Sequence, residues 1–152
     1  KVNKVINDGS ALAKYADMIA AQNGDRRVVD DYKLFPQASE IIEVKSAETG
    51  YITDIDAMAV GISTLMLGAG RETKESIIDY AVGAILKKKV GDFVNKGEVL
   101  AEFYVNDKKR WNEAQTKFLS AYKFSDTKPI VPPIVYAFVD INGVKNLNIA
   151  RP

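Results

Sequence analysis

Two residue types are missing from this sequence altogether, because it contains no cysteine and no histidine. Without cysteine the chain forms no disulfide, no thiolate zinc site and no thiol nucleophile. Without histidine it supplies no imidazole for general acid or base catalysis near neutral pH. We expect it to hold no metal and no cofactor, and a reaction centre of these kinds would need residues that this chain does not contain.

Long apolar runs and an excess of either charge are also missing. No run approaches the ~18 residues of a membrane span, and no signal-peptide pattern opens the sequence. The 21 basic and 20 acidic residues are interspersed, so the charge pattern gives no footprint for nucleic acid. We therefore expect no nucleic acid and no membrane among its partners. We also expect a cytoplasmic location, with which the absence of cysteine is compatible.

The length and the first residue bear on domain organisation. A chain of 152 residues is about one domain, long enough for a hydrophobic core without disulfides or metal ions. The first residue is Lys1 rather than methionine, so we expect the N-terminus to arise by processing or from a boundary inside a longer protein.

The clearest pattern runs from Gly83 to Val105 and predicts two strands joined by a double turn. On the second strand the residues alternate, with Val99, Ala101, Phe103 and Val105 on one face. Glycine reaches positive φ without steric cost, so Gly91 and Gly97 mark the two sharp bends. No catalytic cluster accompanies this hairpin, which favours a structural role.

Helical periodicity dominates the N-terminal part. Apolar residues at helical spacing predict an amphipathic helix over 10–22, with Asp8 or Ser10 at its start and a left-handed turn at Asn23–Gly24. A short helical turn follows over 25–32. Pro36 excludes helix from the residue before it, so we place a boundary between residues 35 and 36.

Beyond that boundary strands and helices alternate irregularly. Strands over 41–46 and 51–56 are predicted to pair as a hairpin, and a helix begins at Ala57 with Asp56 as its N-cap. We attribute Gly61, in the middle of that helix, to close packing against a neighbour. A second helix over 108–122, an extended proline-containing connector and a strand over 134–139 complete the pattern. This predicts an α+β fold.

Three sets of residues could carry chemistry. Gly68-Ala69-Gly70-Arg71 could wrap an anion, but these glycines follow a helix, which favours a C-terminal cap and turn. The acidic pairs Asp54/Asp56 and Asp30/Asp31 are explained by solvent-facing positions and caps. Aromatic residues at helical spacing are expected in the core, not as a platform for bases: Trp111, Phe118 and Tyr122.

The glycine pattern of Val90–Leu100 is similar to the half-repeat of lipoyl and biotinyl carrier domains. A carrier displays its acceptor lysine at a hairpin tip. Lys45 precedes the first turn without a neighbouring methionine, and Lys96 belongs to the turn itself. We therefore interpret the pattern as shared architecture, and keep a carrier-like or interaction module as the alternative function.

Four sequence blocks together resemble the C-terminal third of the pyrimidine-nucleoside and thymidine phosphorylase family, in order and in spacing. They span roughly Val5 to Asp107, and the tail beyond about Asp126 departs from the pattern. The blocks are Met18–Asp25, Val28–Asp31 with Leu34–Ala38, Leu67–Arg71 with Ile78–Asp79 and Val82–Gly83, and Gly91–Ala101.

The resemblance implies a larger enzyme that cleaves pyrimidine nucleosides with phosphate, giving free base and a pentose 1-phosphate. In that family an α-helical domain and an α/β domain close over a cleft. Residues 1–35 would be terminal helices of the α/β domain. Residues 36–152 would be a β-rich C-terminal domain, an α/β-hammerhead or barrel-sandwich arrangement with flanking helices.

The resemblance also implies that the groups that bind phosphate and base lie upstream, so this chain would contain no catalytic and no substrate-binding residue. Its partners would be the remaining domains, and the whole enzyme a homodimer. The residues that choose between uridine and thymidine would also lie upstream. We expect Gly68, Gly70 and Arg71 to form a mobile loop at the edge of the cleft.

Overall fold

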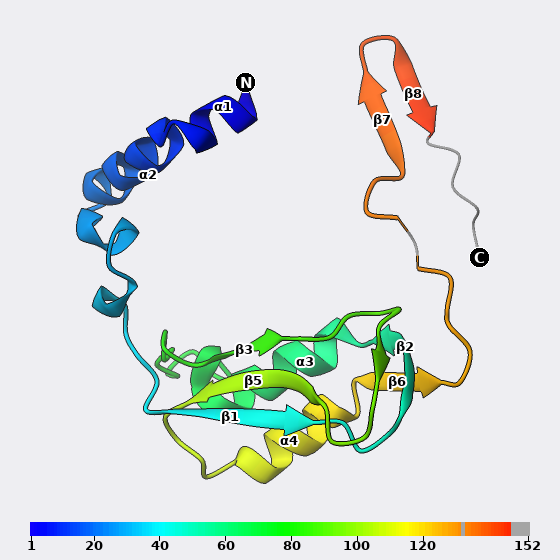
Figure 1. The fold of residues 1–152 in the computed structure, drawn as a ribbon. Coiled ribbons are helices and arrows are strands. Elements are labelled where there is room, and N and C mark those ends of the chain that lie inside the picture. Colours follow the sequence, from blue (N-terminus) through cyan, green and yellow to red (C-terminus); the bar gives the residue numbers. More distant parts are fainter. Residues whose placement is uncertain (132, 147–152) are drawn as a thin grey trace. The chain divides into compact units, whose positions relative to one another are not determined.

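The computed structural model describes residues 1–131 and 133–146. The chain divides between Ser39 and Glu40 into an N-terminal unit, Lys1–Ser39, and a C-terminal unit that begins at Glu40 (Figure 1). None of the helices in the described residues is long and apolar enough to cross a membrane. The assignment of residues 1–35 to a separate domain of a larger enzyme stays a prediction.

The N-terminal unit is helical. Helix α1 (Val2–Asn7) is followed by α2 (Ser10–Ala21) and by two 3₁₀ helices, η1 (Arg26–Val29) and η2 (Tyr32–Leu34). The structure confirms the predicted amphipathic helix as α2. The Asp8 carboxylate accepts hydrogen bonds from the Ser10 backbone N–H and hydroxyl, and Asn23 ends the helix at φ 62°. The sequence analysis missed α1, which is short and buries no residue.

The C-terminal unit contains two three-stranded antiparallel sheets, and strand β5 is the centre of the first. Strand β5 (Val99–Val105) pairs with β1 (Glu40–Lys45) on one side and β3 (Gly83–Leu86) on the other. The predicted hairpin over 83–105 is therefore confirmed. Its two bends lie at Gly91 and Gly97, with φ of 94° and 88°.

The second sheet corrects a predicted pairing. Strand β2 (Gly50–Ile55) pairs with β4 (Phe93–Val94) and β6 (Tyr122–Ser125), not with β1. The expected β1–β2 hairpin is wrong because the connection crosses from one sheet to the other. The Ser46 backbone N–H and C=O bond to Glu98 and Gly97 instead. Local alternation identified both strands correctly but carried no information about their partners.

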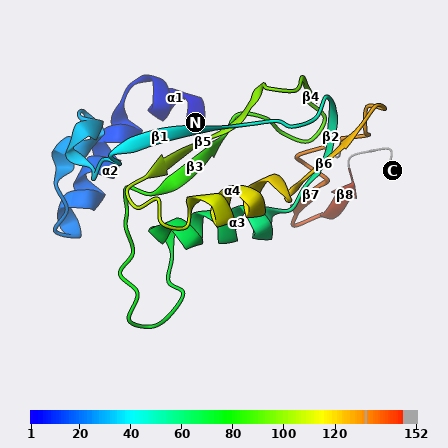
Figure 2. The same cartoon turned by 90° about the horizontal axis from the view of Figure 1, so that it is seen from below.

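Helices α3 (Ala57–Thr64) and α4 (Trp111–Leu119) lie on one side of the first sheet, as Figure 2 shows. The Asp56 carboxylate caps α3 by accepting from Met58 and Ala59, as predicted. One core joins both sheets and both helices, and its largest fully buried side chains are Phe103, Phe118, Ile52 and Leu100. The class is α+β, as the sequence analysis concluded.

Two details of the helices differ from expectation. The predicted reason for Gly61 is wrong, because a Cβ at this position would meet no atom within 4 Å and the residue is exposed. Helix α4 is shorter than the helix predicted over 108–122. It begins at Trp111, and in the preceding loop the Asp107 carboxylate accepts a hydrogen bond from the Lys109 backbone N–H.

The end of the described chain forms a two-stranded hairpin of β7 (Ala137–Asp140) and β8 (Gly143–Asn146). The strand expected over 134–139 is therefore shifted toward the C-terminus, and the hairpin turns between Asp140 and Gly143. Pro132 of the predicted connector and residues 147–152 of the tail lie outside the described residues.

Candidate functional site

The glycine segment sits at the end of a helix. Helix α3 continues into a π-helical turn, η3 (Leu65–Ala69), and Gly68 leaves the helical conformation there at φ 107°. Gly70 is extended. The two glycines therefore end one element and begin the long connection to β3, as the cap-and-turn interpretation favours. Their backbone amides do not lie at the start of a helix, where anions are usually bound.

The far end of this connection is tied back to Gly68 through Asp79. The Asp79 backbone N–H donates to the Gly68 carbonyl at 2.9 Å. Its carboxylate accepts from the Asn106 side-chain amide at 2.7 Å and from the Ala81 backbone N–H at 3.0 Å. These hydrogen bonds, the Asn106 bond first, lower the pKa of Asp79 below its ordinary value. Asp79 therefore stays ionised and closes the base of the loop.

A second tie holds the near end of the loop. The Arg110 guanidinium, just before α4, binds Glu72 at 2.5 Å and Glu113 at 3.3 Å. Both carboxylates raise the pKa of Arg110, Glu72 the more strongly. Arg71 is exposed, and among the described residues it is Glu72, not Arg71, that ion-pairs at this end of the loop. Neither tie could be predicted from the sequence, because the partners are far apart in the chain and show no periodicity.

A hollow of about 380 Å³ lies beside these ties, lined by Met66, Leu67, Gly68, Asp79, Asp107, Lys109 and Arg110. Its two cations are already engaged, since Lys109 pairs with Asp107 and Arg110 with Glu72. Two carboxylates also face it. Among the described residues that line the hollow, none carries an unpaired positive charge with which to hold phosphate, and Arg71 is not one of them.

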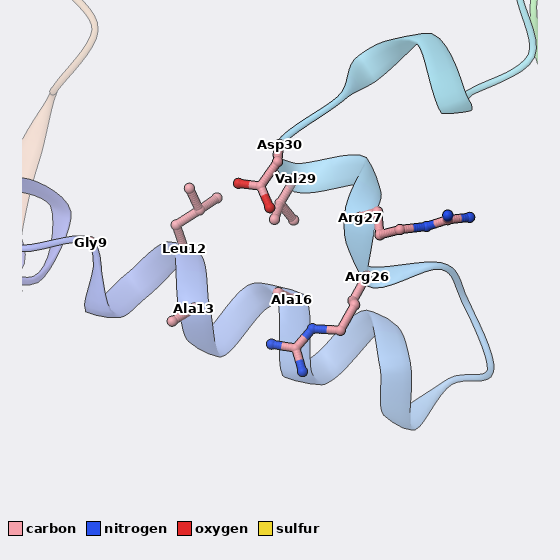
Figure 3. A pocket seen from close by; sticks show the side chains of 8 residues that line it. All are labelled: Gly9, Leu12, Ala13, Ala16, Arg26, Arg27, Val29 and Asp30. Atoms are coloured by element: carbon pink, nitrogen blue, oxygen red, sulfur yellow. The ribbon is translucent and has the colours of Figure 1, made fainter.

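The N-terminal unit has a hollow of its own, of about 420 Å³, which the sequence analysis missed (Figure 3). Leu12 and Asp30 point toward each other across it, whereas Arg27 points away. Arg27 binds Asp25 through two nitrogens and lowers the pKa of Asp25 to about 2. Arg26 binds Asp17 at 3.4 Å. With both arginines paired and apolar walls from α2, this hollow suits apolar side chains better than an anion.

The remaining candidates have structural roles. Asp54 binds Lys123 at 2.9 Å, and Asp31 accepts from the Lys33 backbone at the start of η2. Phe118 and Tyr122 are buried and Trp111 packs edge-on against Phe103, which confirms the expected aromatic core. No group of His, Cys, Asp or Glu within residues 1–131 and 133–146 could hold a metal ion.

The two lysines weighed as carrier positions are also part of the scaffold. Lys45 lies in β1 and binds Glu43 at 3.4 Å. Lys96 lies in the turn before β5, where its backbone N–H donates to the Thr49 hydroxyl at 2.9 Å. That bond joins the turn to the β1–β2 connection.

Comparison with known proteins places the chain in a family. The family model described as the pyrimidine nucleoside phosphorylase C-terminal domain matches residues 51–125. The chain belongs to this family. The matched range covers β2 through β6, including both ties of the loop. The match thus falls on both three-stranded sheets and both helices of the C-terminal unit, apart from β1.

Curated relatives agree. The chain is 45% identical over 135 residues to the pyrimidine-nucleoside phosphorylase of Geobacillus stearothermophilus, covering 89% of this chain and 31% of that protein. It is 46% identical over 106 residues to the Bacillus subtilis enzyme, covering 70% and 24%. The Staphylococcus aureus enzyme matches at 45% over 103 residues, covering 68% and 24%. The chain thus spans about a quarter to a third of the length of these relatives.

Proposed function

We propose that the whole protein transfers the pentose of a pyrimidine nucleoside to inorganic phosphate. The products are the free base and a pentose 1-phosphate. The observation that carries this proposal is the match of residues 51–125 to the C-terminal domain of pyrimidine nucleoside phosphorylases, supported by 45% identity over 135 residues to one such enzyme. In this proposal the 152 residues are a structural domain and supply no catalytic group.

The residue composition of the chain supports the proposal that its catalytic groups lie elsewhere in the whole protein. It has no histidine and no cysteine, and the arginines that line its hollows are already paired with carboxylates. We therefore place phosphate and nucleoside on the upstream domains, with residues 1–35 as terminal helices of the α/β domain. We further propose that the whole enzyme is a cytoplasmic homodimer.

The test is a direct assay of both forms. Full-length protein, supplied with phosphate and either uridine or thymidine, should release uracil or thymine, measured by ultraviolet absorbance or chromatography. Omission of phosphate should stop the release. The 152-residue chain alone should release no base under the same conditions. Base release by this chain alone, or an inactive full-length protein, would contradict the proposal.

We propose also that Gly68, Gly70 and Arg71 lie at the edge of the cleft in the whole enzyme. Arg71 is exposed next to a glycine-bounded turn that both ties hold in place. Arg71→Ala in the full-length protein should lower kcat about tenfold, the equivalent of ~1.4 kcal/mol in the barrier. Lys74→Ala removes a charge from the same loop and serves as the matched control. An unchanged kcat for Arg71→Ala would refute this placement.

A further inference from the structure

An asparagine followed directly by a glycine occurs twice in this chain, at Asn23–Gly24 and at Asn142–Gly143. In this dipeptide the glycine backbone nitrogen can attack the side-chain carbonyl carbon of the asparagine. Glycine permits the approach because it has no Cβ and adopts backbone conformations that other residues resist. The two dipeptides share this chemistry, so any difference between them comes from the surrounding structure.

At Asn23–Gly24 the reacting groups are held in place. The Gly24 backbone N–H donates to the Ile19 carbonyl at 2.9 Å, so removing its proton would also break a hydrogen bond. The Asn23 backbone N–H donates to the Ala20 carbonyl at 3.0 Å, and Asn23 has φ 62°. A Cβ added at Gly24 would lie 2.7 Å from Ile19 Cγ2, so this turn packs tightly against α2. Reaction here must first break these contacts.

At Asn142–Gly143 the constraints are weaker. The dipeptide follows Ile141 in the turn between β7 and β8, the orange to red hairpin of Figure 1. A Cβ added at Gly143 would meet no atom within 4 Å. The Asn142 backbone N–H donates to one Asp140 carboxylate oxygen at 2.8 Å. The Asn142 side-chain nitrogen lies 3.5 Å from the other oxygen, at the far limit of a hydrogen bond, so little holds that side chain.

The hairpin itself gives this turn little support. Every side chain from residue 138 to residue 145 is exposed. Val139 and Val144, which lie opposite each other, are 70% and 65% exposed. A two-stranded hairpin without a packed face is marginally stable in water, so the pair next to the turn, Asp140 opposite Gly143, opens readily. The attacking nitrogen is therefore available at this turn.

We propose that Asn142 is a site of spontaneous deamidation and that the structure protects Asn23 from the same reaction. A base removes the Gly143 amide proton, and the nitrogen bonds to Asn142 Cγ. The Cγ–Nδ2 bond breaks, and Nδ2 takes a proton from water and leaves as ammonia. Water then opens the cyclic imide. Cleavage of the new N–Cγ bond gives aspartate, and cleavage between the nitrogen and the backbone carbonyl gives isoaspartate.

The modification changes the hairpin and leaves the core alone. Either product places a second carboxylate close to Asp140, and isoaspartate also adds a methylene to the backbone within the turn. Because turn length sets the register of a hairpin, the added methylene disturbs the pairing of β7 with β8. Among the described core residues, none belongs to this hairpin. The proposal does not depend on the reaction proposed above.

Peptide mapping of the full-length protein after incubation tests the proposal. The protein is kept at mildly alkaline pH in water enriched in heavy oxygen, and mass spectrometry measures conversion at both dipeptides. Heavy oxygen in the product shows that the imide opened during the incubation, and electron-transfer fragmentation separates isoaspartate from aspartate. Asn142 should convert about tenfold faster than Asn23, the equivalent of ~1.4 kcal/mol in the barrier.

A parallel incubation in urea separates the effect of structure from that of sequence. Without the fold, the rates at Asn142 and Asn23 should differ much less. Asn142→Gln is the matched variant, and it should lose conversion at the hairpin while Asn23 keeps its own slow rate. Equal rates in the folded protein, faster conversion at Asn23, or no conversion at Asn142 would overturn the proposal. A ratio unchanged by urea would do so too, because neighbouring residues would then account for it.

Discussion

The two units of this chain differ greatly in how much apolar surface they bury. The C-terminal unit encloses a contiguous core built around Phe103 and Phe118, with contributions from both sheets and both helices. Among the described residues of the N-terminal unit, only Ala16 and Val28 are buried. Its larger apolar side chains are about half exposed, among them Leu12, Tyr15, Met18 and Phe35.

This difference in burial indicates which unit can fold without the other. Each fully buried large apolar side chain contributes roughly 1.5–3 kcal/mol, and units below about 40 residues seldom bury enough to fold alone. The C-terminal unit has a sufficient core. The N-terminal unit leaves the apolar faces of its helices largely exposed, and its place in an upstream domain stays a prediction.

The largest effect on secondary structure should come from producing the two units as separate chains. Residues 40–152 alone should keep a cooperative thermal transition, because their core lies wholly within them. Residues 1–39 alone should lose most of their helix, because short helices without packing are marginal in water. Far-ultraviolet circular dichroism measures both. A stably helical 1–39 peptide would break the comparison.

Replacing one phenylalanine in each unit by alanine should measure the same difference in burial residue by residue. Phe103 is fully buried against Phe118 and Trp111, so Phe103→Ala should cost ~3–5 kcal/mol of unfolding free energy. Phe35 is 48% exposed in the N-terminal unit, and Phe35→Ala should cost less than about 1 kcal/mol. Urea titration of the 152-residue chain measures both changes, and similar costs would show that the units share one core.

The smallest expected change in stability comes from replacing a glycine in the C-terminal unit. Gly61 is exposed in α3 with open space around it, so Gly61→Ala should stabilise the chain by about 0.5–1 kcal/mol. Gly91→Ala is the matched contrast. There φ is 94°, and an added Cβ would lie 2.3 Å from Val131 Cγ2, so this variant should be destabilised. A destabilised Gly61→Ala in thermal melts would revive the close-packing explanation.

Much of the fold was accessible from sequence, because its signals are local. Alternation identified β5, the Asp56 cap identified the start of α3, and Gly91 and Gly97 identified the bends. Which strands pair with each other could not be predicted from such local signals. Strand β1 has the same alternation whether its neighbour is β2 or β5. Its partner is set by long-range pairing with β5, from Glu40 opposite Val105 to Lys45 opposite Val99.

The candidate site was accessible only in part. Gly68 was correctly assigned as a helix end because a glycine at that place is a local signal. The ties that shape the following loop were not found, since Asp79 meets Asn106 and Glu72 meets Arg110 across long stretches of chain. The placement of Gly68, Gly70 and Arg71 at a cleft stays a prediction until the whole enzyme is measured.

The central position of β5 has a consequence for how the domain is made. Strands β1 and β3 both pair with β5 and precede it in the chain. During synthesis on the ribosome, both must therefore wait with unpaired backbone edges until Val105 has emerged. Such long-range pairing slows folding and leaves strands open to wrong partners. Helper proteins that shield nascent strands should therefore matter most in the interval before β5 leaves the exit tunnel.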